Sequence, residues 1–209
     1  MKAFFLGFER RANLEKEAEV VYHGSPAKVS VLKPANLVPG NTDEDAVHAA
    51  RWAGIALPYA GKRWYDRDIH QSAWIKEVPG QRAGTWREEY TLEEMRPGAF
   101  DEAFKGQKGY LYSLPAGKFH INPKGAHESG DVVSRKKVRP LKVETITDIP
   151  KRLKEEGVVL RKYDPSSPIR LEKVKNMRAS MKSMTPDKRR EYLDWIGETN
   201  PELKQELLK

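Results

Sequence analysis

The stretch Val20–Pro26, VVYHGSP, constrains the fold of this chain most, because it changes from strand-forming to chain-breaking residues within a few positions. Its β-branched and aromatic first half favours an extended strand. Gly24, Ser25 and Pro26 then end that strand. His23 therefore stands at a strand end beside a glycine, where a ligand can approach the backbone closely. The sequence predicts either a binding site or a structural turn at this point.

The rest of the body predicts short strands mixed irregularly with short helices. We expect further strands at 28–35, 46–49, 110–114 and on both sides of the basic run near Pro140. A helix interrupted near Pro58 and a helix capped by Asp148 complete the pattern. Residues 62–90 are aromatic and turn-rich, which favours loops. This mixture indicates an α+β fold.

The two ends of the chain differ from this body. Residues 2–19 place three phenylalanines on one side of a charged helix, which favours packing on the chain's own core or docking onto a partner protein. From about Asp164 the pattern is helical, with Thr185-Pro186 and Asn200-Pro201 as helix starts. We therefore expect an N-terminal amphipathic helix at 1–19, an α+β domain at 20–163 and a basic helical extension at 164–209.

Composition excludes several classes of protein. The 209 residues contain no cysteine, so disulfide frameworks and thiolate metal sites are excluded and a reducing compartment is favoured. No apolar run approaches the roughly 18–20 residues that a membrane span needs. The apolar block at 3–8 is too short for a secretory signal. We expect a soluble, cytoplasmic protein without a membrane partner.

The net charge of +8 allows three kinds of partner: nucleic acid, an anionic ligand or an acidic protein. The basic residues form two clusters, at 135–142 and at 170–190. Either cluster can equally be a solvated surface. The sequence alone leaves these alternatives open.

The tripeptide His23-Gly24-Ser25 has the chemistry to hold a nicotinamide riboside. A glycine backbone offers a donor and an acceptor together, which is what a carboxamide needs. An imidazole beside it can hydrogen-bond a ribose hydroxyl, and serine adds a further polar contact. A His-Gly pair that ends a strand also occurs as a plain turn, so the tripeptide alone decides nothing.

The stretch VYHGSP resembles the first motif of the ADP-ribosyltransferase superfamily, in the branch that includes poly(ADP-ribose) polymerases and RNA 2′-phosphotransferases. Those proteins continue with a strand of small residues, a helix carrying a tyrosine, a central strand and a strand with the catalytic acid. Here AVHAARWAGIALPYAG, KGYLYSLPAGKF and HESGDVVSRKKVRPLKVE follow in that order, over roughly Val20 to Thr147. The resemblance implies a split β-sheet core that uses NAD as a substrate.

The same resemblance implies roles for individual residues. His23, Gly24 and Ser25 would bind NAD, and Tyr59 would stack on the nicotinamide. Glu128 or Asp131 would be the catalytic acid that stabilises an oxocarbenium-like state during transfer of ADP-ribose to a protein or nucleic-acid acceptor. Two departures are visible: Asp131 is one methylene shorter than the family's glutamate, and Val47 and His48 replace the tyrosine of the second strand. Arg51, Lys62 and Arg63 are candidate contacts to the pyrophosphate.

Two other functions compete with the transferase. The same fold without activity can serve as a structural or binding protein. The start of the chain is similar to N-terminal segments of some tailed-phage proteins, which suggests a phage particle. A plain nucleic-acid-binding domain is the third function. A metal site at His120, His127, Glu128 and Asp131 is disfavoured, because the spacing matches no familiar ligand pair.

Overall fold

The computed structural model describes residues 20–35, 45–62, 68–77, 86–121, 131–198 and 200–209. It is an α+β structure, as the sequence predicts, and its larger sheet is antiparallel. The chain divides into two compact units. The first unit contains residues up to 61 together with 106–156, and the second contains 62–105 together with 157–209. The two units are described separately below.

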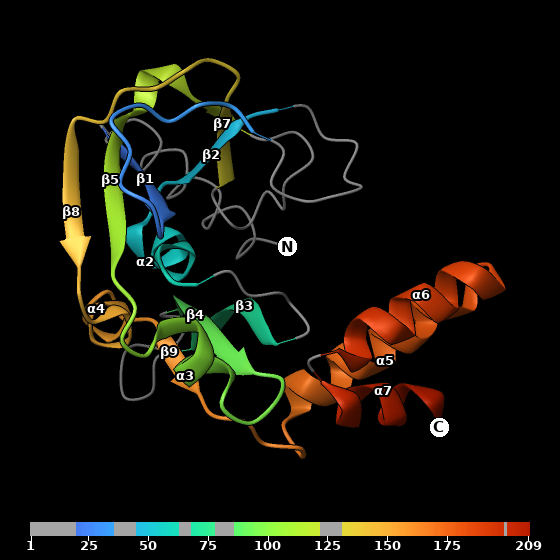
Figure 1. The fold of residues 1–209 in the computed structure, drawn as a ribbon. Helices are drawn as coiled ribbons and strands as arrows, with labels where there is room; N and C mark the ends of the chain where they lie inside the picture. Colours follow the sequence, from blue (N-terminus) through green and yellow to red (C-terminus); the bar gives the residue numbers. More distant parts are fainter. Residues whose placement is uncertain (1–19, 36–44, 63–67, 78–85, 122–130, 199) are drawn as a thin grey trace. The chain divides into compact units, whose positions relative to one another are not determined.

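The first unit is built on a six-stranded sheet in the order β6-β7-β2-β1-β5-β8. The strands are β1 (Val20–Ser25), β2 (Val47–Ala50), β5 (Gly109–Pro115), β6 (His120–Ile121), β7 (Asp131–Ser134) and β8 (Lys142–Ile146). Every neighbouring pair is antiparallel. β1, β2 and β5 therefore confirm the strands expected near their positions. The strand that carries His23 lies inside the sheet, between β2 and β5 (Figure 1).

This sheet opens between β1 and β2. All of β1 pairs with β5, and all of β2 pairs with β7. In the described part of the chain, β1 and β2 share the single register pair Tyr22↔Ala50. Residues 23–25 and 47–49 lie beyond that pair, and the two strands diverge there (Figure 1). The opening lies at the end of β1 where the His-Gly-Ser tripeptide stands.

Helix α2 (Ala53–Ala56) and the 3₁₀ helix η1 (Leu57–Ala60) pack closely on one face of β1. Gly24 makes this approach possible, because a Cβ there would lie 2.0 Å from the carbonyl oxygen of Ala56. Gly109 on β5 has the same role, since its Cβ would lie 2.1 Å from the Ala60 oxygen. Real Cβ atoms do not approach that closely, so both positions require glycine. Helix α4 (Ile149–Glu155) packs against η1.

Two extended segments and a short turn cover the opposite face of the sheet. Residues 26–35 and 135–141 meet there through Leu32 and Val138, whose backbones exchange two hydrogen bonds of 2.9 Å. Both side chains are buried in one cluster with the inward residues of the sheet. The short 3₁₀ helix η2 (Ala116–Lys118) lies beside them, and Phe119 packs on the cluster. The predicted strand at 28–35 is wrong, because this segment forms isolated bridges instead of a ladder.

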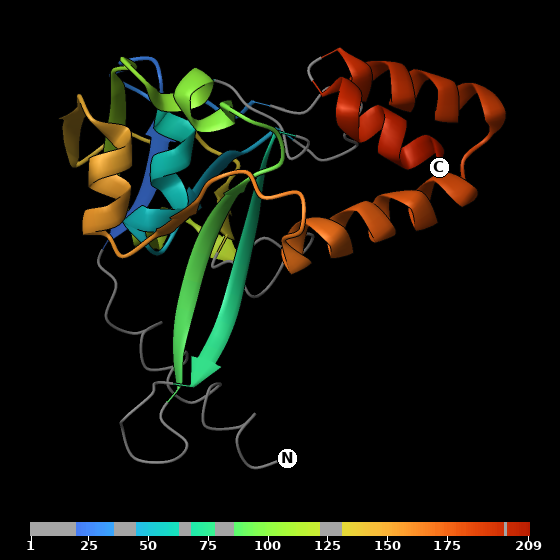
Figure 2. The same ribbon diagram turned by 90° about the horizontal axis from the view of Figure 1, so that it is seen from below.

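The second unit has a sheet in the order β3-β4-β9. β3 (Ile69–Glu77) and β4 (Trp86–Glu94) form a long antiparallel hairpin, which Figure 2 shows from below. β9 (Val159–Arg161) adds to β4 in parallel. The expectation of loops over 62–90 is therefore wrong for the described residues of that range. The sequence of these strands mixes charged, polar and aromatic residues without a regular apolar alternation, so no strand pattern stood out.

A buried carboxylate joins the segments of this unit. Glu94 is only 2% exposed and accepts from the backbone N–H of Phe100 at 2.8 Å and of Tyr163 at 3.1 Å. Phe100 belongs to helix α3 (Ala99–Phe104), and Tyr163 follows β9. One side chain thereby satisfies orphan backbone donors of a helix start and of a strand end.

The unit ends in three helices with their own apolar cluster. α5 (Pro168–Lys182), α6 (Pro186–Gly197) and α7 (Pro201–Leu208) bury residues such as Met177, Ile196 and Leu203 against one another. Thr185 and Asn200 cap α6 and α7 by accepting from the third helical residue, as their positions before proline predict. The Asn200 amide also donates to the Met95 carbonyl at 3.2 Å, which ties the helices to β4.

Among the described helices, none combines the length and the apolar character that crossing a membrane requires. The expected amphipathic helix at 1–19 lies outside the described residues. Its role in docking a partner protein therefore stays a prediction.

Candidate functional site

The imidazole of His23 bridges the opening between β1 and β2. Its Nδ1 lies 2.7 Å from the backbone carbonyl oxygen of His48 on β2. A carbonyl oxygen can only accept, so Nδ1 carries the hydrogen and donates it. In the neutral ring Nε2 then has a free lone pair. The structure thus fixes the tautomer that can accept a hydrogen bond from a ligand hydroxyl.

The surroundings of His23 also keep its ring neutral. Burial lowers the pKa of the imidazole, and the repulsion from His48 lowers it further, whereas the hydrogen bond to the His48 carbonyl acts in the opposite direction. The net shift is downward from the ordinary value of 6.5. Tyr112 on β5 lies beneath the ring, with the two ring centroids 6.0 Å apart. Nε2 is therefore an acceptor at neutral pH.

The backbone of Gly24 faces the same opening. The His48 carbonyl points toward β1, because it accepts from His23. Backbone groups alternate in direction along an antiparallel strand. Ala50, two residues from His48, then also faces β1, which agrees with its register pair Tyr22. By the same alternation the N–H and C=O of Gly24, a buried residue, face the diverging strand.

Tyr59 lies on η1, immediately before Ala60, whose backbone packs on Gly24. Its side chain is 53% exposed, whereas its neighbours in η1 are buried. An aromatic ring that is held by a buried turn and half open to solvent suits stacking on a flat ligand. The structure brings Tyr59 to the element that packs on Gly24.

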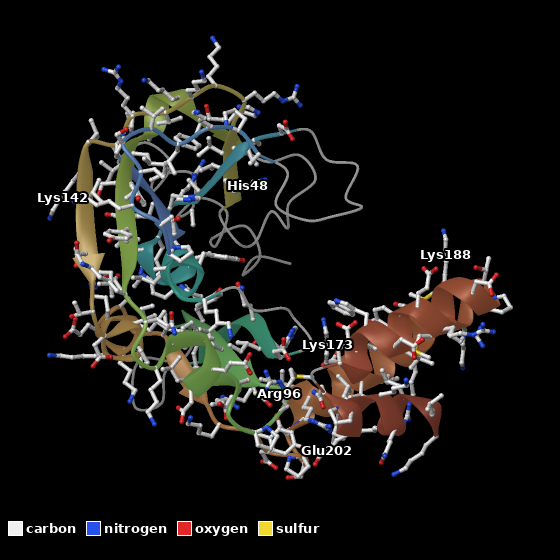
Figure 3. All side chains as sticks on the ribbon, in the orientation of Figure 1. His48, Arg96, Lys142, Lys173, Lys188 and Glu202 are labelled. Atoms are coloured by element: carbon white, nitrogen blue, oxygen red, sulfur yellow. The ribbon has the colours of Figure 1, made fainter. Side chains whose placement is uncertain are left out.

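The sequence analysis missed His48 as a candidate contact. His48 is half-buried, and Figure 3 labels it on β2. It lies two residues from Ala50, so its side chain projects from the same face of the sheet as Tyr22 and Gly24. That face is the one on which α2 and η1 pack. Its position, where the family's second strand carries tyrosine, was the signal that could have found it.

Ser25 has a local structural role. Its hydroxyl accepts a hydrogen bond from the backbone N–H of Ala27 at 3.2 Å. This is the usual way in which serine stabilises a turn. The hydroxyl hydrogen stays available as a donor, but the tight turn accounts for serine at this position without a ligand.

Of the two candidate acids, the structure describes the backbone of Asp131 but not Glu128. Asp131 is the first residue of β7 and pairs with Ala50, which pairs with Tyr22 on β1. Its backbone is thus in the same row of the sheet as the last pair before the opening, roughly 10 Å from β1 at two strand spacings. Glu128 lies outside the described residues, so its candidacy stays a prediction.

The candidate pyrophosphate contacts are dispersed. Arg51 directly follows β2 and is half-buried. Lys62 belongs to the second unit and forms an ion pair with Glu102, with a distance of 3.6 Å between Nζ and Oε1. Arg63 lies outside the described residues. Of the three, Arg51 is the residue closest in sequence to the opening.

Among the residues that the structure describes, no three histidine or carboxylate side chains gather as a metal site. His120 is exposed on β6, beside Val133. His127 and Glu128, its proposed partners, lie outside the described residues.

Comparison with known proteins adds one finding. A model of a family of unknown function (DUF6886) matches residues 98–185, which include α3, β5, β7, β8 and α5. No curated protein and no solved structure matches the chain.

Proposed function

We propose that the first unit binds NAD and transfers its ADP-ribose to a protein or nucleic-acid acceptor, as an ADP-ribosyltransferase-like protein. The observation that carries this proposal is the pairing of a neutral imidazole with a glycine backbone at the opening between β1 and β2. The order of the elements agrees with the resemblance: the His23 strand, the strand of small residues, the turn with Tyr59, then β5 and β7.

Each group has a distinct task in this proposal. The N–H and C=O of Gly24 hold the carboxamide, and the Tyr59 ring stacks on the nicotinamide. Nε2 of His23 accepts a hydrogen bond from a ribose hydroxyl. These contacts orient the ribose so that its C1′ faces the acceptor, and orientation is a large part of the rate in such reactions.

The reaction exchanges one bond at C1′ for another. The bond between C1′ and the nicotinamide nitrogen breaks, and neutral nicotinamide leaves with the bonding electrons. The ribose passes through an oxocarbenium-like state, which a carboxylate of Asp131 or Glu128 stabilises. An acceptor oxygen or nitrogen then bonds to C1′ and gives its proton to solvent or to that carboxylate.

An inactive scaffold on the same fold is the second candidate, and particular observations favour it. Gly24 is required by its contact with Ala56, and the Ser25 hydroxyl serves a turn. Two residues of the tripeptide therefore have structural reasons to be there. A structural or binding protein, including one of a phage particle, needs no more than that.

Calorimetric titration with NAD separates the two candidates. We expect saturable binding that falls at least tenfold in Tyr59→Ala and in His23→Ala. His120→Ala is the matched control, because that exposed imidazole lies on the edge strand β6. Tyr59→Ala is the safer variant, since its half-exposed ring contributes little to folding. No heat at millimolar NAD would favour the scaffold.

Bound NAD would then be followed for release of nicotinamide. Glu128→Gln and Asp131→Asn, made separately, should keep NAD binding, and the one that abolishes release identifies the acid. If neither change slows release, the proposed role of a carboxylate is wrong.

A further inference from the structure

The layer that covers the sheet opposite α2 carries a cluster of exposed basic residues, which we call the basic face. It consists of seven exposed lysines and arginines on residues 26–35, 116–118 and 135–141: Lys28, Lys33, Lys118, Arg135, Lys136, Lys137 and Arg139. These three segments contain no aspartate or glutamate. The whole chain has a net charge of +8, and the basic face alone gathers seven positive charges with no acid among them.

The fold holds these segments together. The two hydrogen bonds between Leu32 and Val138 join the first segment to the third. The Tyr112 hydroxyl, from the strand beneath, donates to the Ala27 carbonyl at 2.7 Å and accepts from the Val29 N–H at 2.8 Å. Because the apolar side chains of this layer point into the cluster below, its charged side chains are left outside.

Six of the seven basic residues of this layer have no ionic partner in the part of the chain that the structure describes. No salt bridge among the described residues involves Lys28, Lys33, Lys118, Lys136, Lys137 or Arg139. Like charges gathered without acids repel one another, so the surface is suited to a polyanion.

We infer that the basic face binds the phosphate backbone of a nucleic acid. Most of its charges are lysines, which contact phosphates as point charges. Val29 and Leu141 are exposed apolar residues on it, but no exposed large aromatic side chain of the described residues lies in its segments. Stacking on bases is therefore not its mode of contact, and the binding should depend on charge more than on sequence.

The position of the basic face also identifies the acceptor, an inference that rests on the proposed function. β1 ends at Ser25, and the first segment of the layer begins at the next residue. The Tyr112 side chain contacts both, since its ring lies under His23 and its hydroxyl holds the backbone around Lys28. A strand bound along this face passes close to the imidazole, so the acceptor of ADP-ribose would be a nucleic acid.

Fluorescence anisotropy with a labelled RNA of about twenty nucleotides, and with a DNA duplex of the same length, tests the binding directly. The test variant carries Lys33→Gln, Lys136→Gln, Lys137→Gln and Arg139→Gln. The matched control carries Lys175→Gln, Lys182→Gln, Lys188→Gln and Arg190→Gln, which remove the same charge from exposed positions of α5 and α6. Thermal unfolding of both variants verifies that they fold.

We expect the test variant to bind roughly 10²-fold more weakly at about 0.1 M salt, with a salt dependence reduced by about 0.7–0.9 per lost phosphate contact. The control should lose less than threefold. Equal losses in both variants would overturn the inference, because the effect would then follow net charge alone. Failure of the full chain to bind either probe at low salt, with binding of polyglutamate instead, would overturn it in favour of an acidic protein. Calorimetry with NAD is independent of these results, so the proposed function can fail while the nucleic-acid surface stands.

Discussion

The basic face and the three C-terminal helices are both rich in lysine and arginine, yet these residues have opposite roles in the two regions. In residues 164–209 acidic residues are interspersed among the basic ones, and several basic side chains serve the fold. Arg170 is 3% exposed and bonds both carboxylate oxygens of Glu206, at 3.3 and 2.6 Å. Arg178 and Arg189 donate to backbone carbonyls of Glu206 and Met181. The segments of the basic face contain no acids, and six of its seven basic side chains form no such bonds in the described part of the chain.

This difference shows what a cluster of basic residues in a sequence can and cannot mean. The helical segment was expected to be the basic extension, because its lysines and arginines are numerous. What decides the role of such a cluster is the acids between its members and the burial of its guanidinium groups. A cluster without acids on extended, outward-facing segments indicates a partner, whereas a balanced cluster on helices indicates internal ion pairs.

The largest effect that tests this comparison is expected from Arg170→Met. The change removes one partner of a buried ion pair and leaves the Glu206 carboxylate, which is one quarter exposed, without its cation. We expect the free energy of unfolding to fall by about 3 kcal/mol, at the low end for broken buried pairs. Urea unfolding measures it.

The control for Arg170→Met is Lys175→Met, which removes an exposed charge from the same helix α5 and should change stability by about 0.5 kcal/mol or less. Adding Glu206→Leu to Arg170→Met should recover part of the loss, because no charge is then left buried without a partner. If Arg170→Met were as stable as the control, the arginines of the helices would be as dispensable to the fold as those of the basic face.

A smaller effect is expected from Tyr112→Phe, which tests how the basic face is held. The change removes the hydroxyl that bonds Ala27 and Val29, and should lower the free energy of unfolding by about 1–2 kcal/mol. It should also weaken oligonucleotide binding several-fold, since the backbone on both sides of Lys28 loses its anchor. Tyr110→Phe, on the same strand, is the control and should change neither quantity appreciably. A loss of stability with unchanged binding would show that this anchor does not shape the basic face.

The smallest effect concerns the pH dependence of stability that His23 contributes beneath the basic face. The pKa of His23 is lower in the folded protein than its ordinary value of 6.5. As the pH falls, the unfolded chain therefore binds a proton at His23 before the folded chain does. Below pH 6.5, proton uptake stabilises the unfolded state relative to the folded state. The free energy of unfolding therefore falls as the pH decreases from 6.5 toward the folded-state pKa. The free energy of unfolding, measured with urea between about pH 5 and 8, should fall more steeply on the acid side for the unmodified protein than for His23→Gln. Parallel curves would mean that the imidazole is no more difficult to protonate in the fold than in the unfolded chain.

Sequence reasoning succeeded where the signal was local. The helix starts at Asp148, Thr185 and Asn200 depend on residues within a few positions of one another. The strand at Val20 was predicted as well, but it continues through Gly24 and Ser25, which were expected to end it. The bridge between Leu32 and Val138 joins residues more than a hundred positions apart, and no local pattern predicts it. The same holds for β9, which pairs in parallel with β4 from far along the chain.

The candidate site was likewise predictable from sequence only in part. His23, Gly24 and Tyr59 could be selected from the letters of one motif and its spacing. The need for glycine could not be explained from sequence, because its cause is the backbone of Ala56 on the next element. The tautomer of His23 could not be predicted from sequence either, because it depends on a carbonyl of the neighbouring strand at the point where the two strands diverge.

The central place of β1 and β2 in their sheet has a practical consequence for anyone who expresses the region that the family model matches. A recombinant fragment of residues 98–185 would contain β5, β7 and β8 but neither of the two strands that lie between β5 and β7. In that fragment β5 and β7 would each present an unpaired edge to other molecules, which promotes aggregation. A soluble product should therefore begin no later than Val20, well upstream of the matched region.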